Sequence, residues 1–280
     1  TVTPSVTPSV TPSVTPSPTP TLTPTATITP TPSATPGPTP DGEARRARAP
    51  ILMYHYISTP PPGAHPYRVG NSVAPEVFAA HLDFLQAEGY TPLPLKTLIS
   101  HLATGRPELP QKPVVITLDD GYVDNYEQAF PALAARGMTA TFFVITDFAN
   151  RAGEPGFEAY ANWAQLAEMA AAGMEIGSHS VDHPDLAGKD QAFLVYQALR
   201  SSETIAAVLG AHPHILAYPA GSYDRLVIDV FRSAHFWGAV TTRQGVWQRS
   251  DRLFEMPRIR ISNDTGAAQL AALLAYDWPE

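Results

Sequence analysis

The 280-residue chain contains no cysteine, which excludes disulfide bonds, cysteine-ligated zinc and a thiol nucleophile. It also lacks a surplus of basic residues, because 26 acidic and 18 basic side chains give a net charge of −8. A nucleic-acid binder needs a basic face, so we expect no nucleic-acid partner. The sequence has no run of about 18 apolar residues, and we therefore expect no segment that spans a membrane.

Charged residues are absent from the first 40 positions, which hold 12 of the 30 prolines and 14 threonines. Proline at every second to fourth residue removes backbone donors and fixes φ, which prevents helices and sheets from propagating. We interpret residues 1–48 as a disordered Thr/Pro/Ser-rich linker that forms an extended spacer. The alternative is a disordered tail that contributes only solubility.

A chain that starts inside such a spacer, with no signal peptide in view, favours an extracellular or cell-surface location. In this interpretation the linker tethers a folded domain that an upstream export segment has carried out of the cell.

Alternating strand and helix patterns fill residues 49–280, which we assign to one domain. We expect seven buried strands, at 50–57, 113–118, 139–146, 174–177, 214–218, 236–241 and 257–261. Helical patterns lie between and after them, at 75–89, 95–102, 124–136, 162–172, 191–209, 225–233 and 266–275. This α/β alternation indicates a parallel sheet with right-handed crossovers, and seven strands favour an irregular (β/α)7 barrel over an open doubly wound sheet.

Polar side chains follow several of these strands, at the edge where parallel α/β folds gather their catalytic groups. Asp119 and Asp120 follow the second strand, and His179, Ser180 and His183 follow the fourth. Two adjacent carboxylates at the end of a buried strand need a cationic neighbour, since desolvation of an unpaired ion is costly. A carboxylate with two imidazoles suits Zn²⁺. A solvated Asp-Asp-Gly turn and an unrelated histidine pair are the alternatives.

Two of these segments carry a family resemblance. Residues 117–121 read TLDDG and resemble the T-F-D-D-G motif of NodB-type polysaccharide deacetylases, carbohydrate esterase family four. Residues 179–183 read HSVDH and match that family's H-[ST]-x-x-H motif. The resemblance covers roughly residues 50–262. It implies a distorted (β/α)7 barrel that removes acetyl groups from N-acetylated sugars with the help of a metal.

The resemblance also implies roles for individual residues. Asp119 would be the general base, and Asp120, His179 and His183 would be the metal ligands. The implied cofactor is a divalent metal, with Zn first and Co, Ni or Fe as alternatives. Ser180 would hold the histidine loop by a hydrogen bond.

The third motif departs from the family pattern. Where the family shows R-x-P-Y-G, residues 217–221 read AYPAG, so Ala217 replaces the arginine that braces the catalytic aspartate. Ala220 replaces the tyrosine, and its backbone N–H is still able to face an oxyanion. We expect Arg258 or Arg260 on the last strand to take the place of the missing arginine. The alternative is that both are surface residues.

The D-x-x-D-W motif and the L-x-H motif, which supplies the usual general acid, are not recognisable. The Met-Tyr-His sequence at 53–55 resembles the opening of the branch that includes biofilm poly-N-acetylglucosamine deacetylases. In that branch the acid histidine comes from the first strand, which implies that His55 is the acid here. Position alone does not separate this role from that of a core or surface histidine.

The resemblance therefore implies a hydrolase that releases acetate from a polysaccharide containing N-acetylglucosamine, such as a surface or biofilm glycan, peptidoglycan or a chitin-like polymer. The alternatives are an acetylxylan-type O-acetyl esterase and a non-catalytic surface barrel that only binds carbohydrate. We expect a monomer. Four aromatic residues are candidates either for stacking on sugar rings or for the core: Tyr122, Trp163, Trp237 and Trp247.

Overall fold

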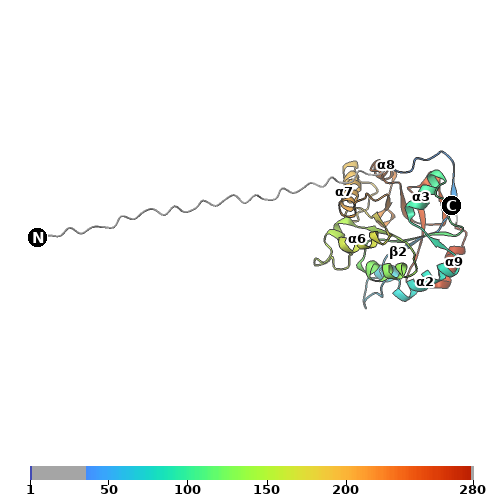
Figure 1. Cartoon of the computed structure of the whole chain (residues 1–280), viewed down its shortest axis with the longest axis horizontal. Helices are drawn as coiled ribbons and strands as arrows, with labels where there is room; N and C mark the ends of the chain where they lie inside the picture. Colours follow the sequence, from blue (N-terminus) through green and yellow to red (C-terminus); the bar gives the residue numbers. More distant parts are fainter. Residues whose placement is uncertain (2–35, 279–280) are drawn as a thin grey trace. The chain divides into compact units, whose positions relative to one another are not determined.

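A closed barrel of seven parallel strands forms the centre of the protein, and Figure 1 shows helices arranged around it. The computed structural model describes residue 1 and residues 36–278. The barrel strands are β2 (Ile51–Tyr54), β4 (Pro113–Leu118), β5 (Thr141–Val144), β6 (Glu175–Ser178), β7 (Ile215–Ala217), β8 (Gly238–Gln244) and β10 (Met256–Arg260). They neighbour one another in chain order, and the pairing of the last strand, β10, with the first, β2, closes the ring. The predicted (β/α)7 barrel is thus confirmed.

Helices lie between the barrel strands and after the last one, and the sequence pattern predicts all of them except the short helices at 66–70 and 146–150. The helices are α1 (Pro66–Gly70), α2 (Pro75–Ala87), α3 (Leu95–Thr104), α4 (Phe130–Ala134), α5 (Thr146–Asn150), α6 (Trp163–Ala171), α7 (Gln191–Leu209), α8 (Arg225–Ser233) and α9 (Ala267–Ala275). Three short helical turns are η1, a π-helix (Asn125–Ala129), and the 3₁₀ turns η2 (Pro219–Gly221) and η3 (Ser250–Arg252). No helix within residues 36–278 has both the length and the apolar character that a membrane crossing requires.

The folded unit begins before residue 49, where the sequence analysis ended the linker. Strand β1 (Arg46–Arg48) pairs antiparallel with β9 (Trp247–Arg249), and the Arg46 guanidinium lies 3.8 Å from the centre of the Trp247 ring. The predicted linker of 1–48 is therefore too long at its C-terminal end. The sequence of β1 is charged and has no apolar alternation that would predict a strand. The strand forms because its backbone pairs with β9. Residues 2–35, which make up most of the predicted linker, lie outside the described residues.

Helix α3 closes the end of the barrel at which the strands begin. One buried cluster joins side chains of the barrel strands to the apolar face of α3: Val115, Phe143, Ile215, Val240, Leu95, Leu98, Ile99 and Leu102. Packing at this end is tight, since a Cβ on Gly238 would lie 2.8 Å from Ile99 Cδ1. The polar side chains that follow the strands therefore lie at the opposite end of the barrel, the rim formed where the strands end. A small strand β3 (Thr91–Pro92) pairs with β4 outside the ring.

A buried carboxylate fastens α3 to the barrel. Glu175 at the start of β6 accepts hydrogen bonds from the Lys96 N–H at 3.3 Å and from the Thr141 hydroxyl at 2.8 Å. Thr141 Oγ1 in turn accepts from the Leu95 N–H at 3.3 Å. These contacts satisfy the first N–H groups of α3, whose N-cap residue Pro94 makes no side-chain cap. Burial raises the pKa of Glu175, and the hydrogen bond from Thr141 acts in the opposite direction.

Substitutions at Glu175 test this fastening. Glu175→Ala should lower the free energy of unfolding by about 1–3 kcal/mol, because buried donors lose their acceptor. Glu175→Gln keeps an acceptor and should lose less. Folding raises the Glu175 pKa above its usual 4.5, so the ionised form costs stability as the pH rises from that value. Urea denaturation at several pH values should show the wild type losing stability relative to Glu175→Gln above about pH 4.5. A pH-independent gap between the two proteins would contradict this assignment.

Candidate active site

Three potential metal ligands converge past the carboxyl ends of β4 and β6. Asp120 Oδ1 lies 3.2 Å from His179 Nε2 and 3.5 Å from His183 Nε2. One ligand atom from each of the three residues lies within 4.8 Å of the others. The side chains of Asp120 and His179 are buried, whereas that of His183 is 31% exposed. The group therefore has one side that solvent or a substrate reaches, as a catalytic metal site requires.

Hydrogen bonding orients the ring of His179. Its Nδ1 lies 2.8 Å from the Ala217 carbonyl oxygen, which only accepts, so Nδ1 carries hydrogen and Nε2 faces Asp120. Burial lowers the pKa of His179, but the hydrogen bond with Asp120 and the charges of Asp119 and Asp120 together raise it above its usual value. Burial likewise raises the pKa of Asp120, but the hydrogen bond with His179 and the nearby charges of His55, His179 and His183 together lower it well below its usual range. The arrangement favours positive charge between these side chains.

Helix α7 and the loop's own serine hold the histidine segment in place. Gln197 Oε1 accepts from the Val181 N–H at 2.9 Å, and Gln197 Nε2 donates to Asp182 Oδ1 at 2.8 Å. Ser180 Oγ accepts from the His183 N–H at 3.0 Å, so the expected hydrogen bond of this serine is present. Gln197 is not among the residues that the sequence pattern predicts for the site. A signal existed, because Gln197 is a polar residue on the buried face of α7.

Left-handed backbone conformations gather at this rim. Four of the five described non-glycine residues with positive φ belong to it: Asp120 (73°), Ser180 (68°), His183 (60°) and Ala220 (52°). Such conformations cost about 1–3 kcal/mol each and persist where the surroundings impose them. Ala220 lies in η2 directly after β7, three residues beyond the carbonyl that holds His179. The strain marks this rim as the functional end of the barrel.

A buried ion pair holds the second carboxylate. Arg258 Nη1 and Nη2 donate to the two carboxylate oxygens of Asp119, each at 2.7 Å. Arg258 also donates from Nη1 to Thr117 Oγ1 at 3.1 Å and from Nε to the Thr241 carbonyl at 2.9 Å. The two ionic side chains are 1% and 3% exposed. All of these groups face the inside of the barrel, where a two-pronged guanidinium fits a carboxylate.

This pair decides which arginine contacts Asp119. Arg258 makes the contact, whereas Arg260 donates to Asn71 Oδ1 at 2.8 Å. Burial raises the pKa of Asp119, but the charge and the hydrogen bonds of Arg258, together with the nearby histidines, lower it below its usual value. Asp119 is therefore a carboxylate at neutral pH and is able to accept a proton.

His55 follows β2 at the same rim and is 6% exposed. Its Nδ1 is fully buried and has no hydrogen-bond partner among the described residues, which leaves Nε2 on the accessible side of the ring. Burial lowers the pKa of His55, while the carboxylates of Asp120 and Asp119 act in the opposite direction. The structure thus brings His55 to the same group of charges as the triad and the ion pair.

Comparison with known proteins adds to this geometry. The family model described as polysaccharide deacetylase matches residues 106–238. The Bacillus subtilis (strain 168) protein named "Putative polysaccharide deacetylase YxkH" is 31% identical over 230 residues, which cover 81% of this chain and 76% of that protein. This chain belongs to the polysaccharide deacetylase family. The deacetylase is accordingly a hydrolase, and the non-catalytic alternative considered from the sequence is set aside.

Two further relatives of the deacetylase extend the comparison. The structure of Streptococcus pyogenes deacetylase PplD in complex with acetate has a TM-score of 0.72 and 28% identity, covering 81% of this chain and 98% of that one. The poly-beta-1,6-N-acetyl-D-glucosamine N-deacetylase of Escherichia coli (strain K12) is 22% identical over 237 residues. That match covers 71% of this chain and 35% of the E. coli protein.

Tyrosines line the rim of the deacetylase beside Asp120. The rings of Tyr56 and Tyr122 stack with centroids 3.7 Å apart, and Tyr122 and Tyr160 stack at 5.2 Å. The Arg68 guanidinium covers Tyr56 at 3.6 Å. Burial raises the pKa of all three phenols, and the charge of Asp120 raises it further. Tyr122 therefore lies at the site, with the rings of Tyr56 and Tyr160 stacked against it.

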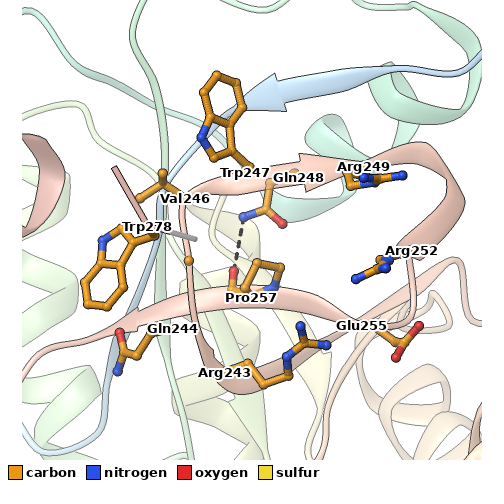
Figure 2. A pocket seen from close by; sticks show the side chains of 11 residues that line it. Arg243, Gln244, Val246, Trp247, Gln248, Arg249, Arg252, Glu255, Pro257 and Trp278 are labelled. Atoms are coloured by element: carbon orange, nitrogen blue, oxygen red, sulfur yellow. Dashed lines mark hydrogen bonds between the residues drawn. The ribbon is translucent and has the colours of Figure 1, made fainter. Parts of the chain in front are cut away.

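Two of the aromatic candidates lie elsewhere. Trp237 stacks on His214 at 3.7 Å just before β8, at the closed end of the barrel. Trp247 begins β9 and lines a hollow between β9 and β10, together with Gln248 and Pro257 (Figure 2). That hollow has a volume of about 40 Å³, which is room for one or two waters and not for a sugar ring. Neither Trp237 nor Trp247, for which the sequence leaves two roles open, therefore lies at the rim that holds the metal-ligand candidates. Trp163 begins α6 and donates to Asn150 Oδ1 at 2.8 Å.

The Arg258–Asp119 pair generates a stability prediction. Arg258→Met should lower the free energy of unfolding by about 3–5 kcal/mol, because Asp119 stays buried without its partner. Combining it with Asp119→Asn should restore part of the loss. Arg260→Met is the matched control and should cost far less. Folding lowers the Asp119 pKa below 3.8, so the pair stabilises the folded wild type fully at neutral pH. This stabilisation is lost only as the pH falls below about 3.8. Equal losses for Arg258→Met and Arg260→Met in urea denaturation would contradict the assignment.

Proposed function

We propose that this deacetylase is metal-dependent and removes N-acetyl groups from a polysaccharide that contains N-acetylglucosamine, releasing acetate. The observation that carries the proposal is a metal-ligand set beside an independently held base. Asp120, His179 and His183 converge on one point, while Asp119 is bound by Arg258 and stays ionised. A barrel that only bound glycan would have no use for this second carboxylate.

The donor set fits a divalent metal. One carboxylate oxygen and two imidazole nitrogens lie within 4.8 Å of one another, and such N/O sets suit Zn²⁺, with Co, Ni and Fe as alternatives. Burial and the neighbouring His179 lower the pKa of His183, which keeps that imidazole neutral and able to ligate. A bound divalent cation supplies Lewis acidity to the site, which acidifies water and polarises a carbonyl.

The chain's own residues divide the remaining work. Asp119 takes a proton from the water that attacks the acetamide carbon. The Ala220 backbone N–H donates a hydrogen bond to the acetamide oxygen, which becomes negative as the water attacks. Ala220 lies in η2, where its backbone is left-handed. As the C–N bond breaks, its electron pair goes to nitrogen and His55 gives that nitrogen a proton from Nε2. The products are acetate and a glucosamine unit.

For the polymer we propose a biofilm-type β-linked poly-N-acetylglucosamine. The Met-Tyr-His sequence at 53–55 and the similarity to the E. coli enzyme named for that polymer support this choice. We further propose that the domain acts outside the cell, which the Thr/Pro-rich composition of residues 1–40 supports.

Loss of a ligand should remove the metal and the activity together. Asp120→Asn and His183→Ala should each lower acetate release from N-acetylglucosamine oligomers by at least about 100-fold and should fail to retain zinc after dialysis. His101→Ala, in the partly exposed part of α3, is the control and should behave as the wild type. Elemental analysis and an acetate assay with and without chelator provide the measurement. Full activity of either ligand variant in chelator would reject the metal site.

The choice of substrate is tested by a panel. With zinc added, acetate release from β-1,6-linked N-acetylglucosamine oligomers should exceed release from acetylxylan in kcat/KM by at least about tenfold. The protonation by His55 suits an amine leaving group more than an alkoxide. Preference for acetylxylan would instead assign the protein to the O-acetyl esterases.

A further inference from the structure

A second polar side chain with an unpaired atom is buried beside His55. Asn125, the first residue of η1, is 2% exposed and donates from Nδ2 to the His55 carbonyl at 2.8 Å and to Asp124 Oδ1 at 2.9 Å. Its Oδ1 is buried without a partner among the described residues, as is His55 Nδ1. An unpaired buried polar atom costs about 1–3 kcal/mol, so two of them in one small cluster point to a shared partner.

The orientation of the Asn125 amide is fixed. If its oxygen and nitrogen were exchanged, the oxygen would face the His55 carbonyl, which accepts hydrogen bonds and cannot donate them. Oδ1 therefore points away from that carbonyl and still needs a donor. The backbone around it is a π-helix of a single turn, a form that often accompanies functional sites.

The two unpaired atoms complement each other. Asn125 Oδ1 only accepts, and an imidazole that gives a proton from Nε2 also carries hydrogen on Nδ1 when it is cationic. No direct hydrogen bond joins the two atoms in the described structure. One buried water would satisfy both, since such waters make two to four hydrogen bonds. It would accept from Nδ1 and donate to Oδ1.

We propose that Asn125 is the positioning residue of His55 and acts through a water bound between Asn125 Oδ1 and His55 Nδ1. Asn125 Nδ2 then holds the backbone carbonyl of His55, and Asn125 Oδ1 holds the His55 ring through the water. The ring is thereby kept from turning, and Nε2 stays aimed at the accessible side of the site. This inference rests on the proposed function, because it concerns the acid of that reaction.

The consequence is specific to the leaving group. An amine leaves the tetrahedral carbon only with a proton, which Nε2 delivers as the C–N electron pair moves to nitrogen. An aryl acetate expels a phenoxide that needs no proton. A variant that loosens His55 should therefore lose amide hydrolysis and keep aryl-ester hydrolysis, whereas damage to the metal site or to the fold would lower both.

The experiment compares Asn125→Leu and Asn125→Asp in the zinc-loaded full chain. With an N-acetylglucosamine oligomer, Asn125→Leu should lower kcat by about 10–100-fold and leave KM within about twofold. With 4-nitrophenyl acetate its rate should stay within about threefold of the wild type. Asn125→Asp keeps the accepting oxygen and loses the Nδ2 donor, so it should recover most of the amide rate if the water bridge matters. If Asn125→Leu does not fold, the Asp variant still decides between the two ends of the amide.

Two controls complete the test. Gln248→Leu removes another fully buried amide with an unpaired oxygen, which lies on β9 beside Pro257 (Figure 2), and should change thermal stability without the split between substrates. In a His55→Ala background, Asn125→Leu should cause no further loss of amide hydrolysis. Parallel loss on both substrates, or an Asp variant as poor as Leu, would overturn the proposal. A wild type that releases no acetate from any N-acetylated oligomer would instead reject the proposed function.

Discussion

The buried contact between Arg258 and Asp119 is the interaction on which the site depends. Two adjacent carboxylates end strand β4, and desolvation alone would drive at least one of them to take up a proton. The guanidinium of Arg258, itself held by Thr117 and Thr241, keeps Asp119 charged inside the barrel. Asp120 is then free to turn, through its left-handed backbone, toward the two histidines. The barrel thus gives the two neighbouring aspartates different roles: Asp119 pairs with Arg258, and Asp120 faces the histidines.

On the histidine side of the site, other parts of the barrel hold the segment that carries His179 and His183. The backbone there is strained, so its shape has to be imposed from outside the loop. Helix α7 does this through Gln197, and the end of β7 does it through the carbonyl that orients His179. The ligand geometry is therefore a property of the packed barrel, because two of the groups that hold the motif, Gln197 and the Ala217 carbonyl, lie outside it.

Much of the architecture could be predicted from the sequence because buried parallel strands leave strong apolar runs. The same logic located Asp119, Asp120 and the histidines, since groups at the ends of parallel strands share one rim. Residues whose partners are distant backbone atoms left no such trace. Asn125 bonds to the carbonyl of residue 55, 70 positions away, and the pattern at 124–136 predicted one helix where the structure has η1 followed by α4. Strand β1 was not predicted for the same reason, because its pairing partner β9 lies about 200 residues later in the chain.

The pairing of β1 with β9 has a consequence for where this domain starts. Between β8 and β10 the chain forms β9 instead of a crossover helix, and Gln248 of β9 donates both to the Ala49 carbonyl and to the carbonyl of Pro257, the residue before Arg258. The chain that leads out toward the N-terminus is thus bonded to the wall behind the ion pair. Cutting the protein at residue 49 would remove β1 from that wall and leave the edge of β9 without its partner strand.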